Sequence, residues 1–234
     1  MGAPLSAQAS VVSPGTRTGT EAERSCQPTP LALALAAGSD DRKVSPLTAF
    51  KLARRWWLQG RRLNLSALAE ELDIGRATLM RWVGTKELLL GEILWSLYKA
   101  TFDQAKARAD GCDGLQGVEY LARIYADINL TLMTAVPLRR FLRDDPRFGL
   151  QVLTSNVSGL QQRLIRTWAA LFEEQIAAGH IAPLMEPEDL AYFIIRIGEG
   201  ALYSDLICGR EPALEPANTA FRLLLSGKEQ ASRA

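Results

Sequence analysis

The chain has 234 residues, and 47% of them are hydrophobic, which is enough for a buried core in one domain or in two modest ones. No apolar run approaches the roughly 18 residues that a membrane-spanning helix needs, so a helical membrane protein is excluded. The cysteines Cys26, Cys112 and Cys208 are odd in number, widely spaced and without metal-ligand spacing. They indicate a reducing environment, and we expect the protein in the cytoplasm.

The charge is unevenly distributed, although the formal net charge is only +1 at pH 7. Residues 42–86 hold ten basic and three acidic residues, about +7, which leaves 17 of the 27 basic and 23 of the 26 acidic residues elsewhere, about −6. Such a split is expected where a DNA-binding segment is joined to a domain that does not bind DNA. The alternative is that the arginine pairs at 54–55 and 61–62 only solvate a helix end.

The N-terminal segment, residues 1 to about 43, is rich in Ala, Ser, Gly, Pro and Thr, and it is expected to be a disordered extension. Its apolar run at 31–37 is too short and too far from the start for a signal peptide. From Pro46 onward the spacing of apolar residues predicts helices throughout, without a strand-period segment of useful length.

The first predicted helix covers residues 46–59, with Pro46 suited to a first helical position and Gly60 to the stop. The second begins at Leu65, and its apolar residues recur at helical spacing as far as Leu72. A short turn at 73–75 contains a glycine, as helix-turn-helix units often do, and a third helix follows at 76–83. We therefore predict a helix-turn-helix DNA-binding domain at residues 44–90.

The helix at 76–83 is suited to enter a DNA major groove. Leu79 and Val83 share one inward face at i, i+4 spacing, which leaves the other side chains outward. Small residues early in the helix and cationic, hydroxyl and aromatic residues on its outer faces are typical of recognition helices. The outward residues are Arg76, Ala77, Thr78, Met80, Arg81 and Trp82.

The rest of the chain is predicted to be a second helical domain at residues 91–228. Thr85 is expected to N-cap a long helix that reaches about residue 109, and a glycine-containing break follows at 110–114. Further helices are expected at about 115–134, 137–144, 157–178, 188–208 and 216–225, and Pro146 is expected to end the second of these. The predicted fold class is all-α, with an N-terminal three-helix helix-turn-helix domain and a helical ligand-binding and dimerisation domain.

Residues 76–89, read as RATLMRWVGTKELL, have a small helix start, a Thr-Leu step and a Thr-Lys-Glu sequence before the next helix. Over residues 45–90 the chain resembles the TetR family of bacterial repressors. The resemblance implies a homodimer that binds a palindromic double-stranded DNA operator near the nucleoid and is released by a small amphiphilic ligand. It assigns base-facing roles to Arg76, Ala77 and Thr78 and phosphate-facing roles to Met80, Trp82 and Lys86. The residues expected to contact DNA are Ser66, Arg76, Ala77, Thr78, Met80, Arg81, Trp82, Thr85 and Lys86.

Two positions depart from the family pattern. Met80 stands where a phosphate-bonding tyrosine is usual, and so that hydrogen bond is lost. Gly75 stands where a serine or threonine usually caps the recognition helix, and glycine offers no side-chain acceptor.

The C-terminal half carries a narrower resemblance. The run at 196–206, RIGEGALYSDL, together with PLRRF at 137–141 and LTS at 153–155, resembles the QsdR-type subgroup of the family. That resemblance implies a lactone or its acyl-chain product as the ligand. The helices at about 188–208 and 216–225 are expected to pair with their mates in a second subunit, where Gly198, Gly200 and Ala201 permit close approach.

Candidate ligand-binding residues come from stripes on these helices. The residues Tyr192, Arg196, Glu199 and Tyr203 share one face. This face is either the polar wall of a ligand cavity, or it forms an internal Arg196–Glu199 pair at i, i+3 or a polar subunit seam. Asn129 interrupts an apolar face and is either a satisfied core residue or a ligand contact; the aromatic candidates at 168 and 172 are either core or cavity wall. The candidates are Tyr125, Asn129, Phe141, Trp168, Phe172, Arg196, Glu199 and Tyr203.

Enzymatic motifs are not evident in the sequence. The one histidine, His180, has no serine or cysteine partner with a recognisable signature, and no phosphate loop, paired metal ligands or nucleophile elbow occurs. We therefore expect no catalysis, no cofactor and no metal. Two alternatives stay open: a chromosome-associated DNA-binding protein without a ligand, and an all-helical enzyme that uses Glu199 with a tyrosine.

Overall fold

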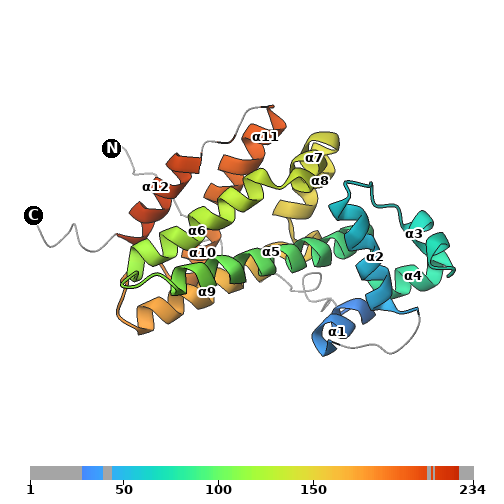
Figure 1. Ribbon diagram of the computed structural model, residues 1–234, viewed down its shortest axis with the longest axis horizontal. Helices are drawn as coiled ribbons and strands as arrows, with labels where there is room; N and C mark the ends of the chain where they lie inside the picture. The colour runs from blue at the N-terminus through green and yellow to red at the C-terminus, as the bar shows by residue number, and fades with distance from the viewer. Residues whose placement is uncertain (1–27, 39–43, 210–211, 213, 227–234) are drawn as a thin grey trace, which may run out of the picture.

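The computed structural model describes residues 28–38, 44–209, 212 and 214–226, and within these ranges the protein contains helices and no strands (Figure 1). Four short helices form one end of the molecule, and the others surround a long central helix. The helices are α1 (Pro30–Ala37), α2 (Pro46–Leu58), α3 (Leu65–Glu71), α4 (Arg76–Val83), α5 (Lys86–Asp110), α6 (Gly117–Thr134), α7 (Val136–Asp144), α8 (Pro146–Thr154), η1 (Asn156–Ser158), α9 (Leu160–Ala177), α10 (Pro187–Glu199), η2 (Gly200–Ser204), α11 (Asp205–Ile207) and α12 (Leu214–Leu225).

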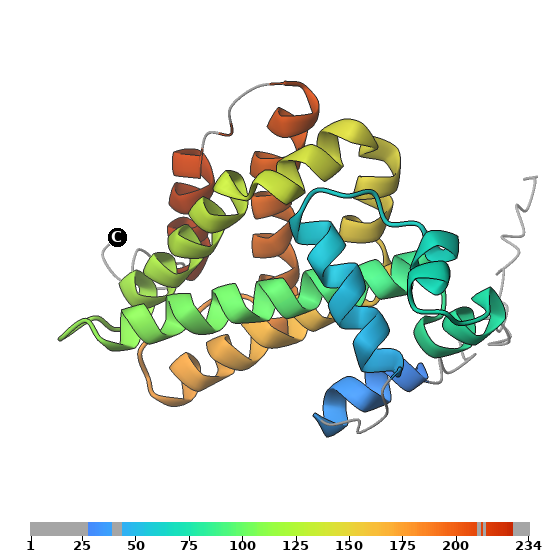
Figure 2. The same cartoon turned by 45° about the vertical axis from the view of Figure 1, so that its right-hand side comes forward.

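Helix α1 corrects the expectation that residues 1–43 are disordered throughout. Thr29 caps it by accepting a hydrogen bond from the backbone N–H of Ala32 at 3.1 Å, and Gly38 ends it with a φ of 75°. Leu31 is fully buried, because α1 packs against both α2 and α4, as Figure 2 shows with this end turned forward. Tertiary packing of a short apolar segment thus outweighs the composition of its surroundings. The remaining part of that expectation, residues 1–27 and 39–43 with Cys26, lies outside the described residues.

The helix-turn-helix elements begin and end close to the predicted positions. The Ser45 hydroxyl accepts a hydrogen bond from the Thr48 N–H, and the Asn64 side chain accepts from the N–H groups of Ser66 and Ala67. Asp73 turns the chain between α3 and α4 with a φ of 52°, a conformation that aspartate tolerates better than most residues. The start of α4 has no side-chain cap, as the glycine at position 75 predicts.

Two predicted segments differ from the structure. Pro146 was expected to end the preceding helix without another helix before residue 157, but it is the first residue of α8, which Asp145 caps by accepting from the Phe148 N–H. Proline suits a first helical position, because it has no N–H to leave unpaired there. The continuous helix expected at 188–208 is instead divided into α10, a π-helical turn (η2) and the short α11. Gly198 and Gly200 lie where α10 changes into η2. Glycine has more backbone freedom than other residues.

The core of the larger part is aromatic. The ring of Tyr125 on α6 stacks on Phe221 of α12 at 4.3 Å, and Trp168 of α9 meets both rings edge-on. Phe172 closes the cluster beside Trp168. Because each ring comes from a helix distant in sequence, this cluster holds α6, α9 and α12 together.

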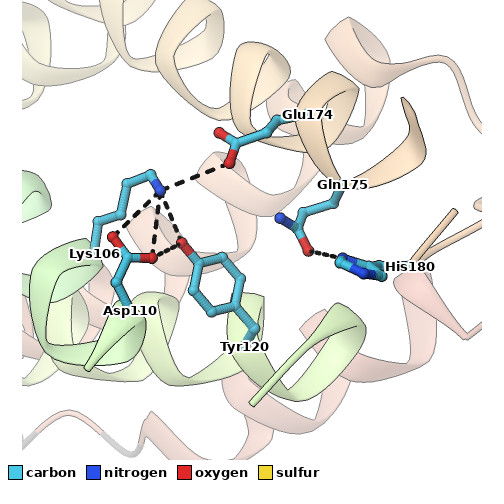
Figure 3. A network of polar contacts seen from close by, with 6 residues as sticks. All are labelled: Lys106, Asp110, Tyr120, Glu174, Gln175 and His180. Carbon is cyan, nitrogen blue, oxygen red and sulfur yellow. Dashed lines mark hydrogen bonds and ion pairs between the residues drawn. The ribbon is translucent and has the colours of Figure 1, made fainter. Parts of the chain in front are cut away.

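A polar network fastens the end of α5 that is remote from the helix-turn-helix (Figure 3). Lys106 donates to the Tyr120 hydroxyl at 3.0 Å, that hydroxyl donates to Asp110 at 2.6 Å, and Glu174 of α9 lies 3.8 Å from the Lys106 Nζ. The side chain of His180 is exposed and lies 3.2 Å from the Gln175 amide oxygen, between Nδ1 and Oε1. The network around Lys106 ties α5, α6 and α9, and the Gln175–His180 pair lies apart from it.

A close helix contact lies where η1 packs on α5 at Gly91. A Cβ atom on Gly91 would stand 2.2 Å from the Ser158 carbonyl oxygen, a distance that no side chain tolerates. Ser158 is fixed in turn, because its hydroxyl donates to the Val152 carbonyl at 2.6 Å. The segment between α8 and α9 therefore rests directly on the backbone of α5.

We predict that Gly91→Ala lowers the free energy of unfolding by about 1–3 kcal/mol or more, since the methyl group must push η1 from α5. Gly111→Ala is the control: its new Cβ would meet nothing closer than 3.6 Å, and its φ of −80° is ordinary. Urea unfolding at one fixed protein concentration measures both variants. Equal stability of the two would contradict the close approach.

Candidate nucleic-acid interface and ligand cavity

The outer faces of α4 present the side chains that the sequence assigned to them. Leu79 and Val83 are buried and anchor the helix. Of the outward set, Thr78 and Trp82 are half-buried, while the others are exposed: Arg76, Ala77, Met80 and Arg81. The anchoring residues leave a free surface along the first two turns of the helix, which is the part that enters the groove in helix-turn-helix proteins.

A basic hollow of about 550 Å³ lies beside this surface, where the starts of α3, α4 and α5 meet. It brings together Ser66, Arg76 and Lys86, which were predicted as DNA contacts, with Arg62, which was not. Arg62 belongs to the loop before α3, and its membership of an arginine pair in the basic segment was the sequence signal for it. Three cations around one hollow favour an anion such as a phosphate group.

Lys86 has a second environment on its other side. Its Nζ lies 4.3 Å from the centre of the Phe148 ring of α8, a cation–π distance. Partial burial lowers the pKa of Lys86, and the nearby Arg62 lowers it further, whereas Asp145 raises it. Thr85 is exposed and caps α5 by accepting from the Leu88 N–H at 3.2 Å, as predicted.

A mostly apolar cavity of about 390 Å³ lies between α2, α5, α6, α9 and α10. Its wall includes five of the eight predicted ligand-binding residues: Tyr125, Asn129, Trp168, Glu199 and Tyr203. Leucine and isoleucine side chains make up about half of the remaining wall. A cavity of this size and composition is typical of sites for small apolar or amphiphilic molecules.

The other three candidates lie away from the cavity. Phe141 packs edge-on against Trp57 at 4.8 Å, and Phe172 is fully buried in the aromatic core. Arg196 donates to Glu199 at 2.7 Å and to the Thr154 carbonyl at 3.2 Å, so the internal-pair interpretation holds for this residue.

The polar groups on the cavity wall differ in how well they are paired. Glu199 accepts hydrogen bonds from Gln161 and Arg196; burial raises the pKa of its carboxyl, while Arg196 and Gln161 act to lower it. Tyr125 donates to the Ile194 carbonyl at 3.1 Å, and burial raises its pKa to about 12. Asn129 is 4% exposed, and its Nδ2 has no hydrogen-bond partner.

Sequence reasoning missed two aromatic residues of the cavity wall. Tyr98 lies on α5, and its hydroxyl accepts a hydrogen bond from the indole N–H of Trp168 at 2.8 Å. Trp57 lies on α2, a helix that the sequence assigned only to the DNA-binding domain. Helical periodicity marks both as partly buried, but it does not show that α2 reaches the cavity.

Helix α7 and the start of α8 connect the cavity with the helix-turn-helix. Pro137 and Leu138 of α7 line the cavity, and so does Trp57, whose ring packs on Phe141. A second hollow of about 320 Å³ lies on the far side of these rings, bordered by Lys86 and Phe148 among others. Arg62 lies 3.7 Å from Asp145 across the same boundary. One short helical segment thus touches both candidate sites.

The outer faces of α10, α11 and α12 carry exposed apolar side chains. Phe193 is 47% exposed, Leu223 64% and Ile207 37%. Among the described residues, no helix is long and apolar enough to cross a membrane, and no group of three metal-binding side chains occurs.

Two comparisons place the chain among known proteins. A family model described as "Tetracyclin repressor-like, C-terminal domain" matches residues 116–226. The solved structure of the R. erythropolis transcriptional repressor QsdR from the TetR family is similar, with a TM-score of 0.68 and 29% sequence identity over 77% of this chain and 93% of that one. No curated protein matches the sequence. The two findings together support a TetR-family transcriptional regulator, with an N-terminal helix-turn-helix and a helical C-terminal domain.

Proposed function

We propose that the protein is a repressor that binds a near-palindromic operator as a homodimer and leaves it when a small amphiphilic molecule fills the cavity. The observation that carries this proposal is Trp57, which belongs to α2 beneath the recognition helix and also lines the cavity. In this proposal residues 28–90 bind DNA in the cytoplasm, at the nucleoid, and residues 91–228 bind the ligand and the second subunit. Helix α1 extends the DNA-binding domain beyond the 44–90 range predicted from sequence.

The proposed DNA contacts follow the exposed surface of α4 and the basic hollow. Arg76, Ala77 and Thr78 face the bases, since they occupy the first turn of the recognition helix. The phosphate-facing group lies around them: Arg62, Ser66, Met80, Arg81, Trp82, Thr85 and Lys86.

The proposed inducer is a lactone or a related acyl compound. QsdR is a transcriptional repressor, and the resemblance of this chain to the QsdR-type subgroup supports that ligand class. The mainly apolar cavity wall with a few polar groups supports an amphiphile. A chromosome-associated protein without a ligand is the second candidate, and it would leave the cavity without a role.

In this proposal, α7 transmits ligand binding from the cavity to the helix-turn-helix. A ligand shifts an equilibrium only by binding one state better than another. In the proposed mechanism, a ligand against Pro137 and Leu138 favours a position of α7 in which Phe141 displaces Trp57 and changes the spacing of the two recognition helices in the dimer. Each step uses a contact that joins the cavity wall to the helix-turn-helix.

The DNA proposal predicts different effects for two cations. Arg76→Ala should lose discrimination at one base position in each half-site, which costs about 1–3 kcal/mol. Lys86→Ala should weaken binding to operator and to random DNA alike. It should also reduce the slope of log affinity against log salt concentration by about one. Fluorescence anisotropy with operator and random duplexes at several salt concentrations measures both effects. Arg123→Ala, an exposed residue of α6, is the control. If the unaltered protein binds both duplexes equally at moderate salt, the repressor proposal fails.

The homodimer proposal predicts that a charge on the exposed apolar face separates the subunits. Phe193→Glu and Leu223→Glu should each raise the dimer dissociation constant by about a hundredfold or more, because an apolar seam cannot solvate an unpaired carboxylate. Leu33→Glu, on the exposed side of α1, should leave the constant unchanged. Sedimentation velocity over a concentration series reports the change. A monomer at micromolar concentration in the unaltered protein would refute the dimer.

The release mechanism predicts that Phe141→Ala separates ligand binding from operator release. The variant should bind ligand within about twofold of the unaltered protein, because Phe141 is outside the cavity. Its operator affinity should no longer fall when ligand is added, whereas a typical allosteric coupling is about 1–3 kcal/mol. Phe141→Leu keeps an apolar contact with Trp57 and should keep most of the coupling. Titrations of ligand with and without operator give the coupling directly, and full coupling in Phe141→Ala would exclude this route.

A further inference from the structure

A second cavity, the junction hollow, lies where the turn after α2, the start of α5 and the corner between α7 and α8 meet. Its volume of about 320 Å³ is large enough for a small molecule. It shares Trp57 and Pro137 with the central cavity, but its other lining residues are different. The junction hollow is therefore a separate candidate site from the one proposed for the inducer.

The wall of the junction hollow carries more positive than negative charge. Asp145 lies 3.7 Å from Arg62, whose side chain is 84% exposed, and Asp144 lies 3.3 Å from Arg140. Exposed ion pairs of this kind contribute little stability, so these arginines remain available to another anion. The charged lining residues are the cations Arg61, Arg62, Lys86 and Arg140 and the carboxylates Asp144 and Asp145, and four minus two leaves about +2.

Lys86 is the cation with the least compensation. Within the described parts of the chain it forms no ion pair with a carboxylate, and its Nζ lies 4.3 Å from the centre of the Phe148 ring. It is the first residue of α5, the end at which the helix dipole disfavours a positive charge. Partial burial lowers its pKa, and the nearby Arg62 lowers it further. A bound anion would offset all of these unfavourable contributions.

Aromatic and aliphatic side chains form the other part of the wall. The rings of Phe141 and Phe148 meet edge-on with their centres 6.0 Å apart, and Phe141 meets Trp57 edge-on at 4.8 Å. Leu63 and Leu90 are buried and border the same hollow. Aromatic rings pack favourably against such rings in stacked or edge-on arrangements. A ligand that has both an aromatic ring and a negative charge therefore matches the whole wall.

The charges at the α7–α8 corner limit the anion to a single charge. A Cβ atom on Gly60 would stand 2.9 Å from a guanidinium nitrogen of Arg140, so this side chain lies directly against the turn after α2. A guanidinium group matches the planar geometry of a carboxylate. Asp144 and Asp145 border the same hollow, and they would repel a phosphate dianion more strongly than a carboxylate.

We propose that the junction hollow binds a small aromatic monocarboxylate, with its ring against Phe141 and Phe148 and its carboxylate beside Lys86 and Arg62. These two cations also line the basic hollow that is proposed for a DNA phosphate. A bound carboxylate therefore competes with DNA for the same charges. The binding site does not depend on a ligand in the central cavity, whereas the competition rests on the proposed DNA-binding function.

Three probes test the site on the unaltered protein. 2-Naphthoate has the ring and the charge, 2-naphthamide has the same ring without the charge, and acetate has the charge without the ring. Isothermal titration calorimetry at low salt gives the three dissociation constants. We expect 2-naphthoate to bind at least about tenfold more tightly than either other probe. Equal binding of 2-naphthamide, or no binding of 2-naphthoate, would refute the site.

Lys86→Met keeps most of the length of the side chain and removes its charge. We expect the affinity for 2-naphthoate to fall about tenfold and the affinity for 2-naphthamide to stay unchanged. Lys99→Met is the matched control, because Lys99 is an exposed lysine of the same helix that pairs with Asp103 and does not border the hollow. It should change neither constant. Circular dichroism establishes that both variants are folded, and an equal loss in both would overturn the assignment to the junction hollow.

Fluorescence anisotropy with labelled DNA tests the competition. Saturating 2-naphthoate should weaken binding to operator and to random DNA by the same factor, about tenfold at about 0.1 M salt if one phosphate contact is lost. The factor should disappear in Lys86→Met and persist in Lys99→Met. A loss confined to operator, or no loss at all, would overturn the competition. If the unaltered protein does not prefer operator to random DNA, the repressor proposal fails, and the calorimetric titrations still decide the binding site.

Discussion

The contact between the Gly91 backbone and the Ser158 carbonyl fixes how the larger helical body sits on α5. Helix α5 begins at Lys86, beside the exposed face of the helix-turn-helix, and five residues later it meets η1 without an intervening side chain. One to two turns further, Leu94, Leu97 and Tyr98 line the cavity. One helix therefore contributes, in order along its length, to the basic hollow, to the close contact with η1 and to the cavity wall. A shift of η1 and α8 relative to α5 changes the environment of Lys86 and of the cavity together.

The polar groups inside the larger body divide into a satisfied set and an unsatisfied set. Glu199 would be costly to bury alone, but Arg196 and Gln161 bond both of its oxygens, and so its charge is compensated within the fold. Tyr125 and Tyr98 also have partners, in a backbone carbonyl and an indole N–H. By hydrogen-bond geometry, three buried side-chain atoms of the described residues lack a partner: Nδ2 of Asn129, Oε1 of Gln161 and Oδ1 of Asn218. The paired groups help to hold α9 and α10 in place, since Gln161 joins Glu199 and Tyr125 joins the Ile194 carbonyl.

Much of the fold could be predicted from the sequence, because helix signals are local. The proline at 46, the cap at Thr85 and the turn at 73–75 are set by a few adjacent residues, and the helices begin and end near them. Helix α1 could not be predicted in this way, because its stability comes from the burial of Leu31 between α2 and α4. The prediction for Pro146 was incomplete for a related reason. A proline that follows one helix can equally begin the next, and only the direction of the chain after the proline decides between the two.

The sites were predictable to different degrees for the same reason. The outward residues of α4 follow from one inward pair, Leu79 and Val83, so the sequence pattern identified the exposed face. The cavity wall combines residues of seven α-helices and the π-helical turn η2, and a stripe on one helix does not show which neighbour covers it. Arg196 and Phe141 lie on the predicted faces and still point to Glu199 and Trp57 rather than into the cavity. Contacts between helices distant in sequence determine where these side chains point, and helical spacing alone does not predict such contacts.

The two departures of the recognition helix from the family pattern have a common physical consequence. Met80 cannot donate the phosphate hydrogen bond of the usual tyrosine, and Gly75 contributes no side-chain cap, so α4 offers fewer directional contacts to the DNA backbone. The basic hollow, with Arg62 beside Arg76 and Lys86, can replace hydrogen bonds with charge. Charge attracts every phosphate alike, and it is screened by salt. Under the proposed function, sequence discrimination would therefore depend more strongly on Arg76, Ala77 and Thr78. Affinity would depend more strongly on Arg62 and Lys86, the cations that the start of α8 contacts through Asp145 and Phe148. The helical segment that borders the cavity through α7 thus touches both cations proposed to bind the DNA backbone, and a ligand in the cavity would weaken operator binding without altering the proposed base-facing residues.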